Sequence, residues 1–137
     1  MRAIIINTAL LTVEAVEVAS FNEAKALLGL DVVSSSLLAR FRGGSIDQVW
    51  SDDWPRNPER AFYLAGRTFS GAGGIIIGAN EQGETIGTRA LLERVREGLV
   101  FLRLERDEER ASDGHVGTAH CICDGNGAPV QLDLTTH

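Results

Sequence analysis

Residues 75–77 are Ile75-Ile76-Ile77, and the stretch Gly78-Ala79-Asn80-Glu81-Gln82-Gly83 follows them directly. A short, β-branched and wholly apolar run of this kind is typical of a buried strand. The polar, glycine-containing residues after it have the composition of a turn. A second run, Ala3-Ile4-Ile5-Ile6, lies near the start of the chain. The two runs predict a fold that is built on a buried β-sheet.

Three further patterns predict hairpins around these strands. The segment 12–18 alternates apolar and charged residues, which predicts a strand that pairs with the first apolar run. Gly43-Gly44 supplies the positive φ angles that tight hairpin turns require. Near the C-terminus, Asp124-Gly125-Asn126-Gly127 separates the apolar segments 116–123 and 130–134, which predicts a C-terminal β-hairpin.

Two segments have the pattern of amphipathic helices. Ser20 and Glu23 form a capping box, and Gly29 is suited to end the helix that follows it. Thr88 can cap a second helix that extends through Glu97. The order of the elements predicts an α+β fold, with a single mixed, mostly antiparallel sheet, two helices on one face and the C-terminal hairpin.

The composition is that of one globular domain over residues 1–137. The chain is 44% hydrophobic and 23% charged, and its net charge is −6 at pH 7. This acidic balance argues against non-specific binding to nucleic acid, which requires many Lys and Arg side chains. No apolar run approaches the ~20 residues that cross a bilayer, and no signal peptide is evident, so we expect a cytoplasmic protein without a membrane segment.

An aromatic and basic cluster is the candidate binding site. Both tryptophans and the one tyrosine lie within a short stretch beside three arginines. Trp, Tyr and Arg are the usual anchors of binding surfaces, and they could hold a protein partner or a small anionic ligand. The alternative is that the rings fill the core while the arginines pair with nearby carboxylates. The candidate residues are Trp50, Trp54, Arg56, Arg60, Tyr63 and Arg67.

Cysteine chemistry is the alternative function. Cys121 and Cys123 lie two residues apart, so in a regular strand both would point to the same face. Either thiol could act in a small hydrolase or transferase if a histidine such as His115 or His137 lay close to it. The spacing does not fit a structural zinc site, and the glycine-rich segment 66–74 lacks the Gly-Lys-Ser/Thr ending of a phosphate loop. We therefore predict no metal and no cofactor.

Three pieces of sequence also resemble a known family. They are MRAIIIN with TVEAVEV at residues 1–18, ALLG at 26–29 and GAGGIIIGANEQGETIG at 71–87. In this order they resemble domain of unknown function 3846, a family of small uncharacterised proteins of phages, plasmids and bacteria. The resemblance covers about residues 1–104, and it implies that residues 111–137 are an appended hairpin. It also implies a mobile-element setting, and it transfers no active site.

Together these patterns predict a non-catalytic binding or accessory protein of a mobile genetic element. Its partner is expected to be a protein or a small anionic ligand held by the aromatic and basic cluster. Exposed strand edges in a small sheet also favour a homodimer.

Overall fold

The first sheet contains both isoleucine runs. A computed structural model describes residues 1–106 and 116–129 of the chain. Five strands lie in the order β2-β1-β7-β4-β3, and a sixth short strand, β8, pairs with β7. The strands are β1 (Arg2–Asn7), β2 (Thr12–Glu17), β3 (Val33–Arg40), β4 (Ile46–Asp52), β7 (Gly73–Ala79) and β8 (Thr85–Ile86). The isoleucine strands β1 and β7 are thus antiparallel neighbours inside the sheet.

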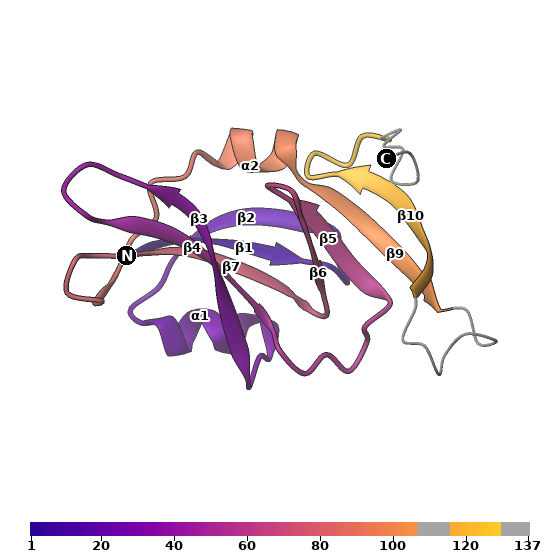
Figure 1. Cartoon of the computed structure of the whole chain (residues 1–137), viewed down its shortest axis with the longest axis horizontal. Helices are drawn as coiled ribbons and strands as arrows, with labels where there is room; N and C mark the ends of the chain where they lie inside the picture. Colours follow the sequence, from indigo (N-terminus) through magenta and orange to yellow (C-terminus); the bar gives the residue numbers. More distant parts are fainter. Residues whose placement is uncertain (107–115, 130–137) are drawn as a thin grey trace.

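A second, four-stranded sheet packs beside the first (Figure 1), so the prediction of a single mixed sheet is wrong. Its order is β10-β9-β5-β6, and every described strand pair in both sheets is antiparallel. The strands are β5 (Arg60–Leu64), β6 (Arg67–Ser70), β9 (Val100–Arg106) and β10 (Val116–Asp124). The α+β class and its antiparallel character are confirmed.

The two helices cover opposite faces of the first sheet, which corrects the prediction that they share one face. In α1 (Phe21–Leu28), Ala24 packs in a cluster with Ile5, Ile75 and Ile77. In α2 (Leu92–Gly98), Val95 packs in another cluster that includes Ile76. Figure 1 shows one helix on each side of the strands. Successive residues of a strand point to opposite faces, so a wholly apolar run needs cover on both.

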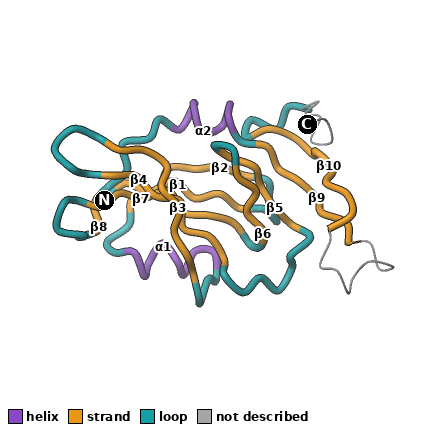
Figure 2. Tube along the Cα trace, in the orientation of Figure 1, coloured by secondary structure: helices purple, strands orange, loops and turns teal. Residues whose placement is uncertain are grey.

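The main core lies between the two sheets. Ile4, Ile6 and Ile76 of the first sheet belong to the same buried cluster as Phe62 and Phe101 of the second sheet. The rings of Phe62 and Phe69 are stacked with their centroids 4.9 Å apart. Figure 2 shows the loop at residues 53–59 crossing from the first sheet to the second. This loop therefore begins and ends on different layers of the core.

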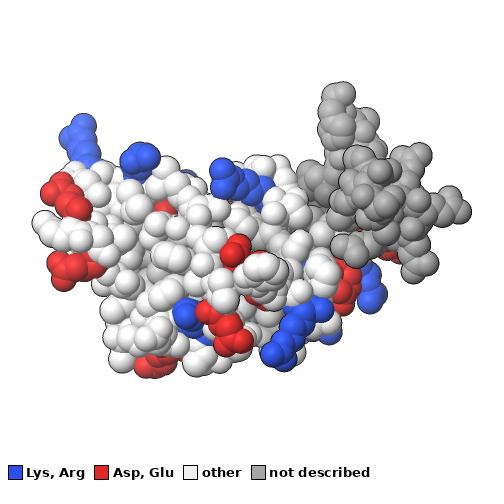
Figure 3. All heavy atoms as spheres, turned by 60° about the horizontal axis from the view of Figure 1, so that its bottom comes forward, with Lys and Arg blue, Asp and Glu red and all other residues white. Residues whose placement is uncertain are grey.

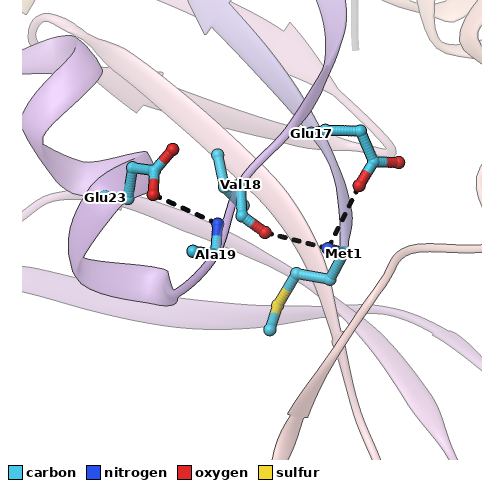
Figure 4. A network of polar contacts seen from close by, with 5 residues as sticks. All are labelled: Met1, Glu17, Val18, Ala19 and Glu23. Carbon is cyan, nitrogen blue, oxygen red and sulfur yellow. Dashed lines mark hydrogen bonds and ion pairs between the residues drawn. The ribbon is translucent and has the colours of Figure 1, made fainter.

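The start of α1 confirms the predicted cap with one change of partner. The Ser20 hydroxyl accepts a hydrogen bond from the Glu23 amide at 3.2 Å. The Glu23 carboxylate accepts from the amide of Ala19 at 3.2 Å, one residue before the expected donor (Figure 4). The Met1 ammonium group donates to the Val18 carbonyl at 2.8 Å and pairs with Glu17 at 3.1 Å, so the first strand is tied to the helix entry.

The second helix starts later than predicted. Its first residue is Leu92, and its cap residue Leu91 makes no side-chain cap hydrogen bond. The Thr88 hydroxyl instead accepts from the Ala90 amide at 3.0 Å, which forms a local turn. Threonine side chains often compete with helix formation in this way, so this local turn contributes to the shift.

β10, the last strand among the described residues, belongs to the second sheet. β10 pairs along β9, and the chain turns after it, with the Asp124 amide donating to the Ala128 carbonyl at 2.9 Å. The expected partner strand at 130–134 lies outside the described residues. The division into residues 1–104 and an appended 111–137 stays a prediction. Among the described residues, no helix combines the length and the apolar character that crossing a bilayer requires.

Candidate functional site

A cavity of about 480 Å³ opens where the end of α1 meets the loop after β4. Two of the predicted site residues, Trp54 and Arg56, line it. The remaining walls come from residues that are distant in sequence, and the full lining is Leu28, Gly29, Asp31, Val32, Asp52, Trp54, Arg56, Asn57 and Ala72. Three separate segments of the chain must therefore be fixed in place to form the cavity.

The end of α1 positions the first segment. Gly29 adopts a left-handed conformation with φ 65°, and its amide donates to the Ala26 carbonyl at 3.2 Å. The Leu30 amide donates to the Lys25 carbonyl at 3.1 Å, which completes a Schellman-type helix end. The chain then reverses, and the Val32 carbonyl accepts from the Asp53 amide at 2.9 Å. Residues 31–32 are thereby held beside residues 52–53.

The loop after β4 positions the second segment. The Asp52 carboxylate accepts from the Trp54 amide at 3.1 Å, which forms an Asx turn. The loop closes where the Asn57 carbonyl accepts from the Arg60 amide at 3.1 Å. Between these two points the Trp54 side chain is 76% exposed. An aromatic ring this exposed makes little contribution to the core and is available for contact with another molecule.

The connection between β6 and β7 forms the back wall of the cavity. The Thr8 hydroxyl donates to the Gly71 carbonyl at 2.6 Å, and the Thr8 amide donates to the Ala72 carbonyl at 3.1 Å. Gly71 has φ +112°, and a Cβ atom there would lie 2.8 Å from the Asp52 Cβ and 3.0 Å from the Pro55 Cβ. Glycine is therefore required at this position for the loop to pack closely on the wall.

The charges around the cavity are mixed and slightly acidic. Asp31 and Asp52 contribute two carboxylates, and Arg56 contributes one guanidinium group. The carbonyl end of α1 adds partial negative charge. Apolar surface lies next to these groups, because Leu27 is 54% and Val32 48% exposed. Figure 3 shows acidic and basic side chains interspersed over this side of the molecule, with no extended region of one sign.

The other predicted site residues lie elsewhere. Trp50 is half-buried beneath α1, and its ring centroid lies 4.8 Å from that of Phe21. Tyr63 packs with Ala61 and Val100 in a separate cluster of the second sheet. The predicted cluster therefore does not form one surface. As for its remaining members, Arg60 lines a second cavity of about 180 Å³, and the Arg67 guanidinium donates to the Ser36 hydroxyl at 2.9 Å.

Sequence reasoning missed the walls that the end of α1 and the connection between β6 and β7 contribute. Asp31 and Val32 lie two and three residues after the helix-ending Gly29, and both side chains are exposed. An exposed valine just after a helix end is a weak signal of an interaction surface. Nothing in the local pattern showed that this segment would lie next to residue 53, because that contact depends on the pairing of β3 with β4.

The two cysteines lie on opposite faces of β10, so the prediction of a shared face is wrong. A register shift between Cys121 and Cys123 inserts an extra residue, which reverses the alternation. Cys121 packs in the cluster with Leu102, whereas Cys123 belongs to the main core with Phe101. His120 pairs with Glu105 at 3.3 Å on the surface. His115 and His137 lie outside the described residues.

The environment of Cys123 is poorly suited to a nucleophile. Burial raises the pKa of the Cys123 thiol, and the nearby Asp124 carboxylate raises it further. The reactive thiolate is therefore less populated at neutral pH than in an ordinary cysteine. In the part of the chain that the structure describes, no group of three or more His, Cys, Asp and Glu side chains could hold a metal ion.

Thiol labelling tests the cysteine alternative. In the variant Cys121→Ser, Cys123 should react slowly with 5,5′-dithiobis-(2-nitrobenzoate) at neutral pH and faster as the pH rises, because only the thiolate attacks the reagent. Absorbance of the released thiolate gives the rate. The same variant unfolded in urea provides the reference for an accessible thiol. Equal rates in the native and unfolded protein at neutral pH would show that Cys123 is reactive and would restore the enzyme hypothesis.

Comparison with known proteins gives no assignment for this site. No protein-family model matches the chain, and no curated protein or solved structure matches it significantly. The resemblance to domain of unknown function 3846 stays a prediction. The function of the chain must therefore be inferred from the geometry of the cavity.

Proposed function

We propose that this chain is a non-catalytic binding or accessory protein that holds a protein partner through the Trp54 cavity. The observation that carries the proposal is the 76% exposed Trp54 ring at the edge of a cavity of about 480 Å³. Tryptophan and arginine dominate binding hot spots because they contribute large contact areas and directed hydrogen bonds. Trp54 and Arg56 provide this pair on one loop.

The surroundings of the cavity favour a protein over a small anionic ligand. Two carboxylates face one guanidinium group, so the cavity does not concentrate the positive charge that a small anion needs. Exposed Leu27 and Val32 extend the apolar surface beyond the cavity. An apolar patch with a polar rim is the usual form of a protein–protein interface.

The wider setting belongs to the same proposal. The resemblance to domain of unknown function 3846 supports a role in a mobile genetic element, and the composition supports a cytoplasmic location. Among the described residues, β3 and β6 are edge strands, and such edges would allow pairing with a second copy.

Differential capture from the native host tests the proposal. Tagged wild-type protein should enrich a partner that the double variant Trp54→Ala/Arg56→Ala fails to enrich, as measured by quantitative mass spectrometry. Because Trp54 is exposed, the free energy of unfolding of the double variant should differ from that of the wild type by less than about 1 kcal/mol.

Leu10→Ala is the matched control, because Leu10 is 70% exposed and does not line the cavity. This control should capture the same partner as the wild type. The proposal would be contradicted if every enriched protein were retained by the double variant. A large loss of stability in the double variant would show instead that the loop is part of the core.

A further inference from the structure

A second, more apolar groove lies at the other helix, and it shares no lining residue with the Trp54 cavity. Its volume is about 350 Å³, within the range of small-molecule sites. Apolar side chains from β3, the hairpin that follows it, β5 and α2 line most of it. The residues that line it include Leu38, Phe41, Asp47, Leu64, Arg89, Leu91 and Arg94.

Hydrogen bonds hold one wall of the groove in place. Asp47 is only 2% exposed, and its carboxylate accepts from the Arg89 amide at 3.2 and 3.4 Å. The Arg2 carbonyl accepts from the Thr88 amide at 2.9 Å, and the Arg2 guanidinium donates to the Ala90 carbonyl. The segment before α2 is thus fixed to the first sheet, while Leu91 remains 60% exposed beside the groove.

Two cationic side chains stand at the groove. The Arg89 guanidinium lies over the Phe41 ring, 4.9 Å from its centroid. Within residues 1–106 and 116–129, neither Arg89 nor Arg94 forms an ion pair. The Asp47 carboxylate accepts its hydrogen bond from the Arg89 backbone amide and is only 2% exposed, so the two guanidinium groups are the charges that the groove presents to solvent. Exposed apolar surface is therefore combined with two unpaired positive charges.

We propose that this groove binds an aliphatic carboxylate, a fatty acid or a related acyl anion. The alkyl chain lies along Leu38, Leu64 and Leu91, where it removes apolar surface from water. The carboxylate accepts charge-assisted hydrogen bonds from Arg89 and Arg94. Arginine suits this role because its planar guanidinium can bind a carboxylate in a bidentate manner. The proposal does not depend on the function of the Trp54 cavity.

Titration with dodecanoate, kept well below the concentration at which it forms micelles, tests the proposal. Calorimetry should show saturable binding of one dodecanoate per chain, and amide NMR shifts should concentrate at Phe41, Leu64 and Leu91. Acetate should not bind, because it lacks the alkyl chain. Dodecyltrimethylammonium should bind at least about tenfold more weakly, because its charge is repelled by the arginines.

Variants at exposed positions test the location without endangering the fold. Arg94→Gln should weaken dodecanoate binding about tenfold, and Leu91→Asp should abolish it, because the new carboxylate repels the ligand. Arg103→Gln is the matched control, since Arg103 is an exposed arginine outside the groove, and its affinity should equal that of the wild type. The proposal is overturned if dodecanoate does not bind, if the cationic amphiphile binds equally well, or if Leu91→Asp binds like the wild type.

Discussion

The variant Gly73→Ala should lose about 3 kcal/mol or more of its free energy of unfolding, which is a large part of the stability of a small domain. Gly73 has φ +155°, and a Cβ atom there would lie only 1.8 Å from the Ile6 carbonyl oxygen. That oxygen belongs to β1, whose Asn7 is paired with Gly73. The added methyl group must therefore push apart the two isoleucine strands at the centre of the sheet. Urea denaturation followed by circular dichroism measures the loss.

Gly83→Ala separates this steric effect from backbone strain. Gly83 also has a positive φ, +79°, but a Cβ atom there would meet nothing within 4 Å. This variant should lose only about 1 kcal/mol, the cost of placing a side chain in the left-handed region. If Gly73→Ala were no more destabilising than Gly83→Ala, the close approach of β1 and β7 at Gly73 would be wrong.

The local elements of this fold were predictable because their signals are local. The capping residue Ser20 and the helix-ending Gly29 both act through hydrogen bonds within a few residues, and both were identified from the sequence. The isoleucine runs also predicted their strands. In contrast, the start of α2 depends on contacts of residues 88–90 with Asp47 and Arg2, which are far away in the sequence.

The arrangement of the layers was less predictable. A strand that is apolar on both faces must have other elements packed on both of them, but the sequence does not show which element packs on which face. The strand β6 lies inside the glycine-rich segment 66–74, and because glycine is uncommon in strands, this segment did not predict one. The second sheet was missed partly for that reason. The bulge between Cys121 and Cys123 likewise leaves no clear mark in the sequence.

The candidate site shows the same limit. Closeness in sequence placed Trp50 and Trp54 in one cluster, yet Trp50 packs beneath α1 while Trp54 is exposed in the loop. The residues that complete the cavity, such as Asp31 and Ala72, come from other elements. The sequence identified the aromatic and basic side chains. Which of them share a surface is decided only by the tertiary structure, that is, by how the strands and loops pack together.

Substitutions at the contact between the two sheets should also cause a large loss of the free energy of unfolding. Phe62 is completely buried, and a Cβ atom at Gly74 would lie 2.6 Å from the Phe62 Cζ atom. The tip of this ring therefore touches the backbone of β7 in the other sheet. Phe62→Ala should lower the free energy of unfolding by about 3–5 kcal/mol, because it opens a cavity between the layers. Urea denaturation of the variant measures the loss.

A double-mutant cycle distinguishes this direct contact from a general loss of apolar volume. Gly74→Ala alone should destabilise the protein by about 1–2 kcal/mol, because its methyl group overpacks against the Phe62 ring. In a Phe62→Leu background the shorter side chain leaves room, so the same substitution should be less costly by at least about 0.5 kcal/mol. Gly98→Ala, where a Cβ atom meets nothing within 4 Å, should have the same effect in both backgrounds. The effects of Gly74→Ala and Phe62→Leu on the free energy of unfolding are coupled only if the Phe62 side chain and β7 compete for the same space. Strictly additive effects would therefore mean that the sheets do not meet at this pair.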